Sequence, residues 1–300
     1  MEAWIIMSVA AAAFQTLRFM LQKQLSLGGL SAGGATLARF AYSAPFVVIG
    51  LAAYLIWTGA DLPARGGAFW AYALTGALAQ VLATWCVVAL FAMRNFAVGI
   101  TFKKTEVIQT ALVGLLVLGD GIGTVALIAI LIGLLGVLVL SDDAGLPGLS
   151  LRRMMNRAAG LGLASGAFFA VSAVAYRGAT LEVASGDPLM RAGVALAVVT
   201  TSQAIGLGLW LAWREAGQLR AVWRARRVAV WMGLTSMGGS LCWFTAFTLQ
   251  NAALVFAVGQ IEVIFSILVS VSVFKERMTG REGLGIALLT VSILGLVLLG

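Results

Sequence analysis

Histidine is absent from this chain of 300 residues, and cysteine occurs only at Cys86 and Cys242. Without histidine and without a Cys-x-x-Cys pair, the sequence offers no recognisable metal or redox motif. We interpret both cysteines as small apolar side chains buried in helices. An enzyme working inside a membrane would be left with carboxylate chemistry alone. The sequence therefore predicts a protein that is not an enzyme and that uses no metal and no cofactor.

Charged residues are also scarce, at 11% of the chain against 61% for apolar residues. Together with a mean hydropathy of +1.01, this composition excludes an ordinary soluble domain. The apolar runs are continuous rather than alternating, which favours helices over a membrane barrel and predicts an all-α integral membrane protein. Its ten predicted transmembrane helices are residues 3–24, 31–57, 68–92, 96–118, 122–141, 158–179, 188–213, 228–249, 252–274 and 281–300.

The net charge of +8 is distributed unevenly, in a way that indicates membrane orientation rather than nucleic-acid binding. If each loop takes the number of the helix before it, the odd-numbered loops and their flanking helix ends hold thirteen basic residues. The other face has three, Arg65, Arg177 and Arg191. The positive-inside rule then predicts a multi-pass protein of a bacterial-type inner membrane with both termini outside. The basic stretch 214–227, flanked by tryptophans, predicts contact with anionic lipid on the cytoplasmic face.

The two halves of the chain resemble each other at an offset of 156 residues, which pairs the cysteines, two asparagines and two acidic segments. The matching segments are Asn95 with Glu106-Val107-Ile108, and Asn251 with Glu262-Val263-Ile264. Five helices per half is an odd number, so the second copy enters the membrane the other way up. We therefore expect two inverted five-helix repeats, residues 1–143 and 158–300, joined by a linker at 144–157.

Glu106 and Glu262 lie in the middle of apolar segments, where a carboxylate costs about 2.5–3.5 kcal/mol to insert. Lys103 shares a helix face with Glu106, whereas Lys104 points about 100° away and reaches toward another helix. The halves agree in the acid and differ in the base, because Gly259 and Gln260 replace the two lysines. An asymmetric cavity of this kind is what recognition of a zwitterion or an anion requires.

Several alternatives remain open for these polar residues. Glu106 could pair with a neighbouring lysine, and Glu262 with Arg18 or Arg39, for helix packing alone, although buried ion pairs stabilise poorly. The two asparagines could cap helices, and the tryptophans could pack in the core instead of walling a pocket. The candidate substrate-binding and coupling residues are Lys103, Lys104, Glu106, Glu262, Arg18, Arg39, Asn95, Asn251, Trp85 and Trp243.

Residues 252–299, AALVFAVGQIEVIFSILVSVSVFKERMTGREGLGIALLTVSILGLVLL, resemble the closing helices of the EamA repeat in the drug/metabolite transporter superfamily. A weaker version appears in the first half as RNFAVGITFKKTEVIQTALVGLLVLGDGIG, followed by GLLGVLVL. The resemblance implies a ten-helix secondary carrier with a central cavity lined by helices 1, 3, 4, 6, 8 and 9. It also implies a YddG-like exporter of amino acids or related metabolites.

Together the residues and the resemblance predict an exporter of small metabolites, amino acids including aromatic or hydrophobic ones, that works by alternating access. Lysines would hold a substrate carboxylate, and the glutamates its ammonium group or a coupling proton. One chain can enclose the whole pathway, so a monomer suffices, and no nucleic acid is expected as a partner. The alternatives are an exporter of lipophilic cations or drugs within the same fold, and a membrane scaffold or sensor that transports nothing.

Overall fold

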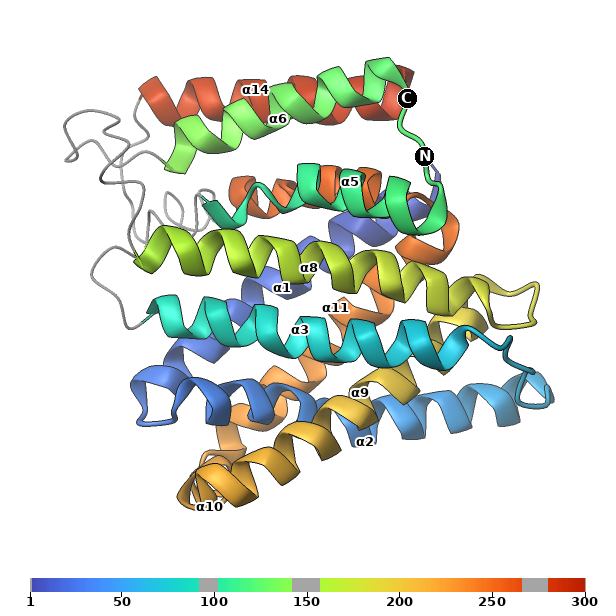
Figure 1. The fold of residues 1–300 in the computed structure, drawn as a ribbon, viewed down its shortest axis with the longest axis vertical. Coiled ribbons are helices and arrows are strands. Elements are labelled where there is room, and N and C mark those ends of the chain that lie inside the picture. The colour runs from blue at the N-terminus through green and yellow to red at the C-terminus, as the bar shows by residue number, and fades with distance from the viewer. Residues whose placement is uncertain (1, 92–101, 142–156, 266–279, 300) are drawn as a thin grey trace.

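A computed structural model of the protein describes residues 2–91, 102–141, 157–265 and 280–299, and these residues form helices joined by short turns (Figure 1). The helices are α1 (Ala3–Leu27), α2 (Ala32–Thr58), α3 (Phe69–Phe91), α5 (Glu106–Leu118), α6 (Thr124–Ser141), α8 (Arg157–Leu181), α9 (Pro188–Arg214), α10 (Ala216–Arg224), α11 (Arg226–Leu249), α12 (Ala252–Gly259) and α14 (Gly280–Leu299). In these ranges, extended pairing is limited to one isolated β-bridge between Arg65 and Val183.

Five of these helices, α1, α2, α3, α8 and α9, are long and apolar enough to cross a membrane. Four shorter apolar helices lie within the fourth, fifth, ninth and tenth predicted transmembrane segments. Large apolar side chains also cover the outside, where Ile56, Trp57 and Leu116 are each at least 80% exposed. Water disfavours such a surface and lipid accepts it, so the all-helical chain is a multi-pass membrane protein.

Local sequence signals explain where several helices begin and end. The Ser31 hydroxyl accepts a hydrogen bond from the backbone N–H of Gly34 at 3.0 Å and caps α2. Asp187 caps α9 in the same way, and Pro188 occupies the first helical position, where its missing N–H costs nothing. Gly59 and Gly119 end α2 and α5 with φ angles of 64° and 70°, which glycine adopts without strain.

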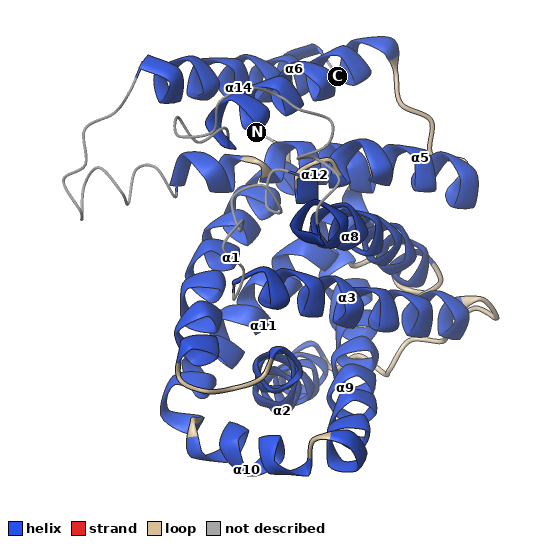
Figure 2. Cartoon of the chain, turned by 60° about the vertical axis from the view of Figure 1, so that its left-hand side comes forward, coloured by secondary structure: helices blue, strands red, loops and turns tan. Residues whose placement is uncertain are grey.

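The helices of the two halves interleave instead of packing as separate bodies. The most extensive contacts are α3 with α8, α1 with α11, α6 with α14, and α2 with α9. At an offset of about 156 residues, the counterpart of α1 is α8 and that of α3 is α11, so the α3–α8 and α1–α11 contacts are equivalent. α2 packs against its own counterpart α9, and α6 packs against its own counterpart α14. α6 and α14 lie together at one edge of the molecule (Figures 1 and 2).

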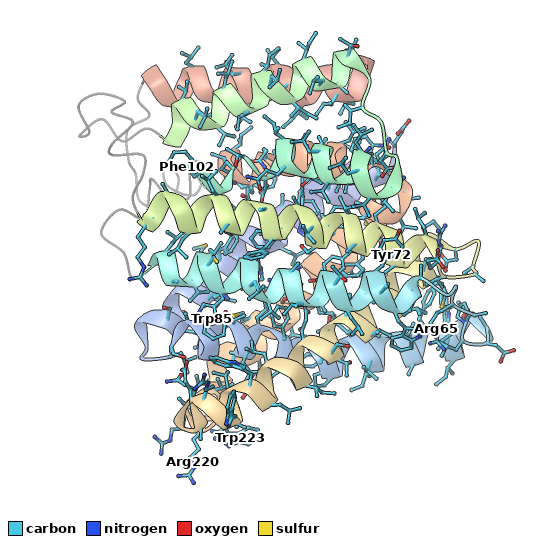
Figure 3. The ribbon with its side chains drawn as sticks, viewed as in Figure 1. Arg65, Tyr72, Trp85, Phe102, Arg220 and Trp223 are labelled. Carbon is cyan, nitrogen blue, oxygen red and sulfur yellow. The ribbon has the colours of Figure 1, made fainter. Side chains whose placement is uncertain are left out.

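The chain alternates between the two ends of the helices. In Figure 1, α1 begins and α14 finishes on the right, with the turns that follow α2, α5 and α8; we call this the termini end. The turn after α1 and the short helix α10 lie on the left, which we call the α10 end. α10 falls within the stretch expected to be a loop, and its Arg220 and Trp223 project away from the molecule (Figure 3). Exposed arginine and tryptophan on an amphipathic helix are typical of a membrane interface.

The fourth and ninth predicted helices are interrupted, contrary to the expectation of continuous segments. A turn at residues 104–105 separates helical residues 102–103 from α5. Gln260 forms a turn after α12, and helical backbone resumes at 261–265. The Thr105 hydroxyl donates to the Phe102 carbonyl at 2.7 Å, which competes with the helical pattern. The breaks start at positions 156 residues apart, which is the offset at which the two halves of the sequence resemble each other.

α2 and α11 cross so closely that a side chain would not fit at Gly233. A Cβ atom there would lie 2.6 Å from the backbone carbonyl carbon and oxygen of Tyr42. We expect Gly233→Ala to lower the free energy of unfolding by about 1–3 kcal/mol, because the two backbones must separate. Thermal unfolding of the purified protein measures this, with Gly206→Ala as the control, since a Cβ at Gly206 meets nothing within 4 Å. Equal stability of the two variants would contradict the close crossing.

Candidate functional site

A pocket lies where α1, α8 and α11 meet the two interrupted helices, between the halves of the chain. Its lining residues are Gln15, Lys103, Glu106, Phe169, Trp243, Phe256, Gly259, Gln260 and Glu262. Gln15 and Phe169 stand at the midpoints of the 25-residue helices α1 and α8, which places the pocket halfway through the helix layer. Its free volume of about 20 Å³ has room for a water molecule and not for a metabolite.

Four charged side chains meet at the break in the fourth predicted helix, just before α5. The Lys103 Nζ atom donates to Glu106 Oε1 at 2.8 Å. The Lys104 Nζ atom donates to Glu262 Oε1 and so joins the two halves of the chain. None of the four residues is more than 8% exposed. The lysine that was expected to point away from the Glu106 face therefore reaches the acid of the other half.

Glu262 is also tied to α1 through a chain of polar side chains. The Gln15 Nε2 atom donates to Glu262 Oε2, while Lys104 occupies the other carboxylate oxygen. Arg18 donates from Nη2 to Gln15 Oε1 at 3.4 Å. Among the described residues, no salt bridge joins Glu262 to Arg18 or Arg39, the two partners considered from the sequence. The amide of Gln15 connects Arg18 with Glu262 by hydrogen bonds.

Arg39 lies away from the pocket lining and is only 4% exposed. Its Nε atom donates to Ser236 Oγ at 3.1 Å, and its Nη1 atom donates to Thr84 Oγ1 at 2.9 Å. Hydroxyls from α3 and α11 thus hold a guanidinium from α2, and neither carries a compensating charge. The structure brings the acids and lysines together, connects Arg18 with them through Gln15, and holds Arg39 among α2, α3 and α11.

The two candidate tryptophans differ in their surroundings. Trp243 lines the pocket, stacks on Phe247 with 5.8 Å between ring centroids, and meets Phe256 edge-on at 5.3 Å. Trp85 instead packs edge-on against Trp210 at 5.0 Å, in a cluster of apolar side chains from α2, α3, α9 and α10. Trp243 is thus a pocket wall, whereas Trp85 packs in the core, which was the alternative role considered for it.

The asparagine of the second half caps a helix. Asn251 Oδ1 accepts a hydrogen bond from the backbone N–H of Ala253 at 2.9 Å, which caps α12, as one of the two sequence-based alternatives predicted. Its Nδ2 atom donates to the Asp120 carbonyl at 3.5 Å. Asn251 does not line the pocket. Asn95, its counterpart in the first half, lies outside the described residues.

The sequence did not single out Gln15, Phe169, Phe256 or Gln260, all of which line the pocket. Gln15 carried a usable signal, since it is an uncharged polar residue in the middle of an apolar run. The two phenylalanines carried none, because an aromatic residue in a membrane helix meets lipid or protein equally well. No group of three metal-ligating side chains occurs within the described ranges.

The termini end of the molecule is closed by polar contacts between the halves. Arg177 of α8 donates from Nε to Asp120 Oδ2 at 2.7 Å, and from Nη1 to the carbonyls of Phe247 and Gln250 at 2.8 and 2.9 Å. The hydroxyl of Tyr54 donates to Asp187 Oδ2 at 2.6 Å. The backbones of residues 64–66 and 182–184 also exchange hydrogen bonds. Arg177, interpreted from the sequence only as a loop charge, therefore links α8 to the turn after α5.

Comparison with known proteins agrees with this architecture. Residues 156–298 match the model of the EamA-like transporter family. A solved structure, described only as a crystal structure of a protein, aligns with 99% of this chain and 96% of its own at a TM-score of 0.70 and 15% identity, so the two share a fold. No curated protein matches the chain. The protein thus carries an EamA-like transporter domain and belongs to the drug/metabolite transporter superfamily.

Proposed function

We propose that the protein is a secondary carrier of small metabolites, principally amino acids, which cross the membrane by alternating access through the central pocket. The observation that carries this proposal is the buried Lys104–Glu262 pair, which joins the two halves at mid-depth beside two helix breaks. Interrupted helices beside a midplane site are typical of carriers built from inverted repeats. The EamA-like domain supports transport of small molecules in general.

The proposal includes ten helices arranged as two inverted five-helix repeats, residues 1–143 and 158–300. Three observations support it: the helix contacts persist when the halves are exchanged, the breaks recur after 156 residues, and equivalent loops differ in basic content. The carrier would be a YddG-like exporter in a bacterial-type inner membrane. Its basic loops would face the cytoplasm and its termini end would face outside. Anionic lipid would contact α10, and a monomer would suffice.

The paired charges provide a mechanism for substrate entry. A zwitterionic amino acid can insert into a Lys–Glu pair, with its carboxylate on Lys103 or Lys104 and its ammonium group on Glu106 or Glu262. One ion pair then becomes two, so neither member of the Lys–Glu pair is left uncompensated in the low-dielectric interior. In a proton-coupled cycle, a glutamate would carry the proton in place of the ammonium group. Because Lys104–Glu262 spans the halves, breaking it would also free them to move apart and widen the pocket.

Two other functions fit the described residues less well. A carrier of lipophilic cations would bring its positive charge beside two buried lysines, which repel it. A membrane scaffold or sensor that transports nothing would not need charged residues at the pocket, and neutral replacements there would leave it functional. The amino-acid carrier uses both the lysines and the acids.

The test is transport by the purified protein in proteoliposomes, with radiolabelled amino acids and the variants Glu106→Gln and Glu262→Gln. We expect each variant to transport roughly tenfold to a hundredfold more slowly than the wild type, because a charge-assisted hydrogen bond is lost. Glu215→Gln is the control, since Glu215 lies between α9 and α10, away from the pocket. Full activity of both pocket variants would refute the proposed role of the glutamates.

A further inference from the structure

The buried charges of the described residues do not balance. Among the described residues, the buried charged side chains are four cations and two anions. Both anions, Glu106 and Glu262, pair with lysines of the fourth helix. The remaining cations, Arg18 and Arg39, are 3% and 4% exposed. A charge buried in a membrane protein is expensive unless it is compensated, so the excess of two positive charges requires an anion.

The guanidinium groups of Arg18 and Arg39 each have N–H donors that form no described hydrogen bond. A guanidinium carries five N–H donors in a planar fork. Within the part of the chain that the structure describes, Arg18 makes one hydrogen bond, at 3.4 Å to Gln15, and its Nη1 atom is buried without a partner. Arg39 uses two donors, on the hydroxyls of Ser236 and Thr84. No carboxylate described in the structure forms a salt bridge with either arginine.

A second buried side chain on α1 also has polar atoms without hydrogen-bond partners. Gln22 is 0% exposed, and neither its Nε2 nor its Oε1 atom has a partner within the described ranges. It lies four residues after Arg18 and therefore on the same face of the helix. Buried polar groups almost always have hydrogen-bond partners, so such a cluster is suited to binding a polar ligand.

Arg39 belongs to this cluster by the packing of α1 against α11. A Cβ atom at Gly239 of α11 would lie 3.0 Å from the Cβ atom of Phe14 of α1. Ser236, which accepts from Arg39, lies about one turn from Gly239 toward the α10 end, as Arg18 does from Phe14.

The cluster lies beside the pocket, toward the α10 end. Arg18 follows Gln15 by about one helical turn in the direction of that end. The hydrogen bonds from Arg18 to Gln15 and from Gln15 to Glu262 connect it with the pocket lining. The opposite side of the pocket faces the closed termini end. A ligand that spans a few ångströms can therefore contact both the arginines and the ion pairs.

We propose that Arg18 and Arg39, with Gln22, form an anion-binding site beside the pocket, and that the transported metabolite is an anion with a carboxylate or phosphate group held there. This inference rests on the proposed carrier function and narrows its substrate class. Guanidinium groups bind both anions in bidentate geometry, which matches the free donors of the arginines. Acidic amino acids, dicarboxylates and phosphate esters of similar size fit the site, whereas zwitterions leave the excess charge in place.

Thermal unfolding of the purified full-length protein in detergent tests the site, because a ligand that binds the folded state raises its stability. The probes are succinate, glycerol 3-phosphate and leucine, each titrated to obtain a Kd. We expect one or both anions to stabilise the wild type more than leucine does. Arg18→Gln and Arg39→Gln should each weaken anion binding roughly tenfold to a hundredfold. Arg220→Gln, on the exposed side of α10, removes the same charge and should change nothing.

Binding of succinate alone identifies a carboxylate site, binding of glycerol 3-phosphate alone identifies a phosphate site, and either result supports the proposal. The wild-type titration decides the matter even where an arginine variant fails to fold. If leucine stabilises the wild type and neither anion does, or if none of the three binds, the anion site is wrong. Leucine binding accompanied by leucine transport would leave the carrier proposal intact. Anions that bind but are not moved across proteoliposome membranes would contradict the carrier instead.

Discussion

Replacement of Glu262 by leucine is expected to lower the free energy of unfolding by about 3–5 kcal/mol, because it leaves Lys104 buried without its counter-charge. Lys104 is 6% exposed, and its ammonium group donates to Glu262. Lys104→Met should be costly for the reciprocal reason, although Gln15 would still donate to the stranded carboxylate. Thermal and chemical unfolding in a single detergent measure both effects.

The double variant Lys104→Met/Glu262→Leu decides whether the pair acts as a unit. Replacing both partners of a buried ion pair with apolar residues of similar volume is often neutral, so we expect the double variant to be more stable than the Glu262→Leu single variant. Arg220→Met and Glu215→Leu, at the membrane surface, form a control cycle that should be additive. Additive losses at the buried pair would contradict the contact between the two side chains.

The same double variant separates packing from transport. If the ion pair serves only to hold helices together, an apolar replacement that restores stability also restores transport. If the charges bind substrate, the double variant folds and transports nothing. Buried ion pairs stabilise poorly compared with apolar packing, and this favours the second outcome. Stability and transport measured on one preparation therefore distinguish a scaffold from a carrier.

The positions of the helices along the chain could be predicted from the sequence, because a segment that crosses lipid has to be long and apolar. A span needs about twenty apolar residues, and each predicted run has a helical counterpart among the described residues. The two acids could be predicted as pocket residues for the same reason, since a carboxylate is costly in a membrane wherever it points. Both line the pocket, and so does Trp243.

The helix breaks and the pairing of the charges could not be predicted in the same way. A hydropathy profile does not reveal the turn at residues 104–105. It averages the apolar character of a segment, whereas the turn involves a local hydrogen bond from the Thr105 hydroxyl to the Phe102 carbonyl.

The partner of Glu262 depends on how the fourth and ninth predicted helices pack against α1. This packing brings Lys104 into hydrogen-bond contact with Glu262 and places Gln15 between Glu262 and Arg18. Sequence spacing describes faces of one helix, whereas these contacts lie between helices.

Removal of the Arg177 side chain is expected to open the termini end. Arg177 joins Asp120 after α5 to the last carbonyls of α11, with 16% and 19% exposure at the two charged side chains. Cations near the end of a helix also stabilise its exposed carbonyl groups. In Arg177→Gln, these contacts weaken together, so closed conformations lose stability relative to conformations that are open at this end.

Cysteine labelling measures this shift in a background where Cys86 and Cys242 are replaced by alanine. Thr248→Cys places a thiol near the end of α11, where the native residue is only 8% exposed. We expect Arg177→Gln to raise the rate of maleimide labelling at this cysteine about tenfold. A loss of about 1.4 kcal/mol in the stability of the closed conformation raises the ratio of open to closed molecules by that factor. Arg191→Gln is the matched control: Arg191 lies at the same end, but its Nε atom donates to Thr180 within the same half. Labelling that rises equally in both variants would indicate a general loosening of the fold and would refute a specific role for Arg177 in closing the termini end.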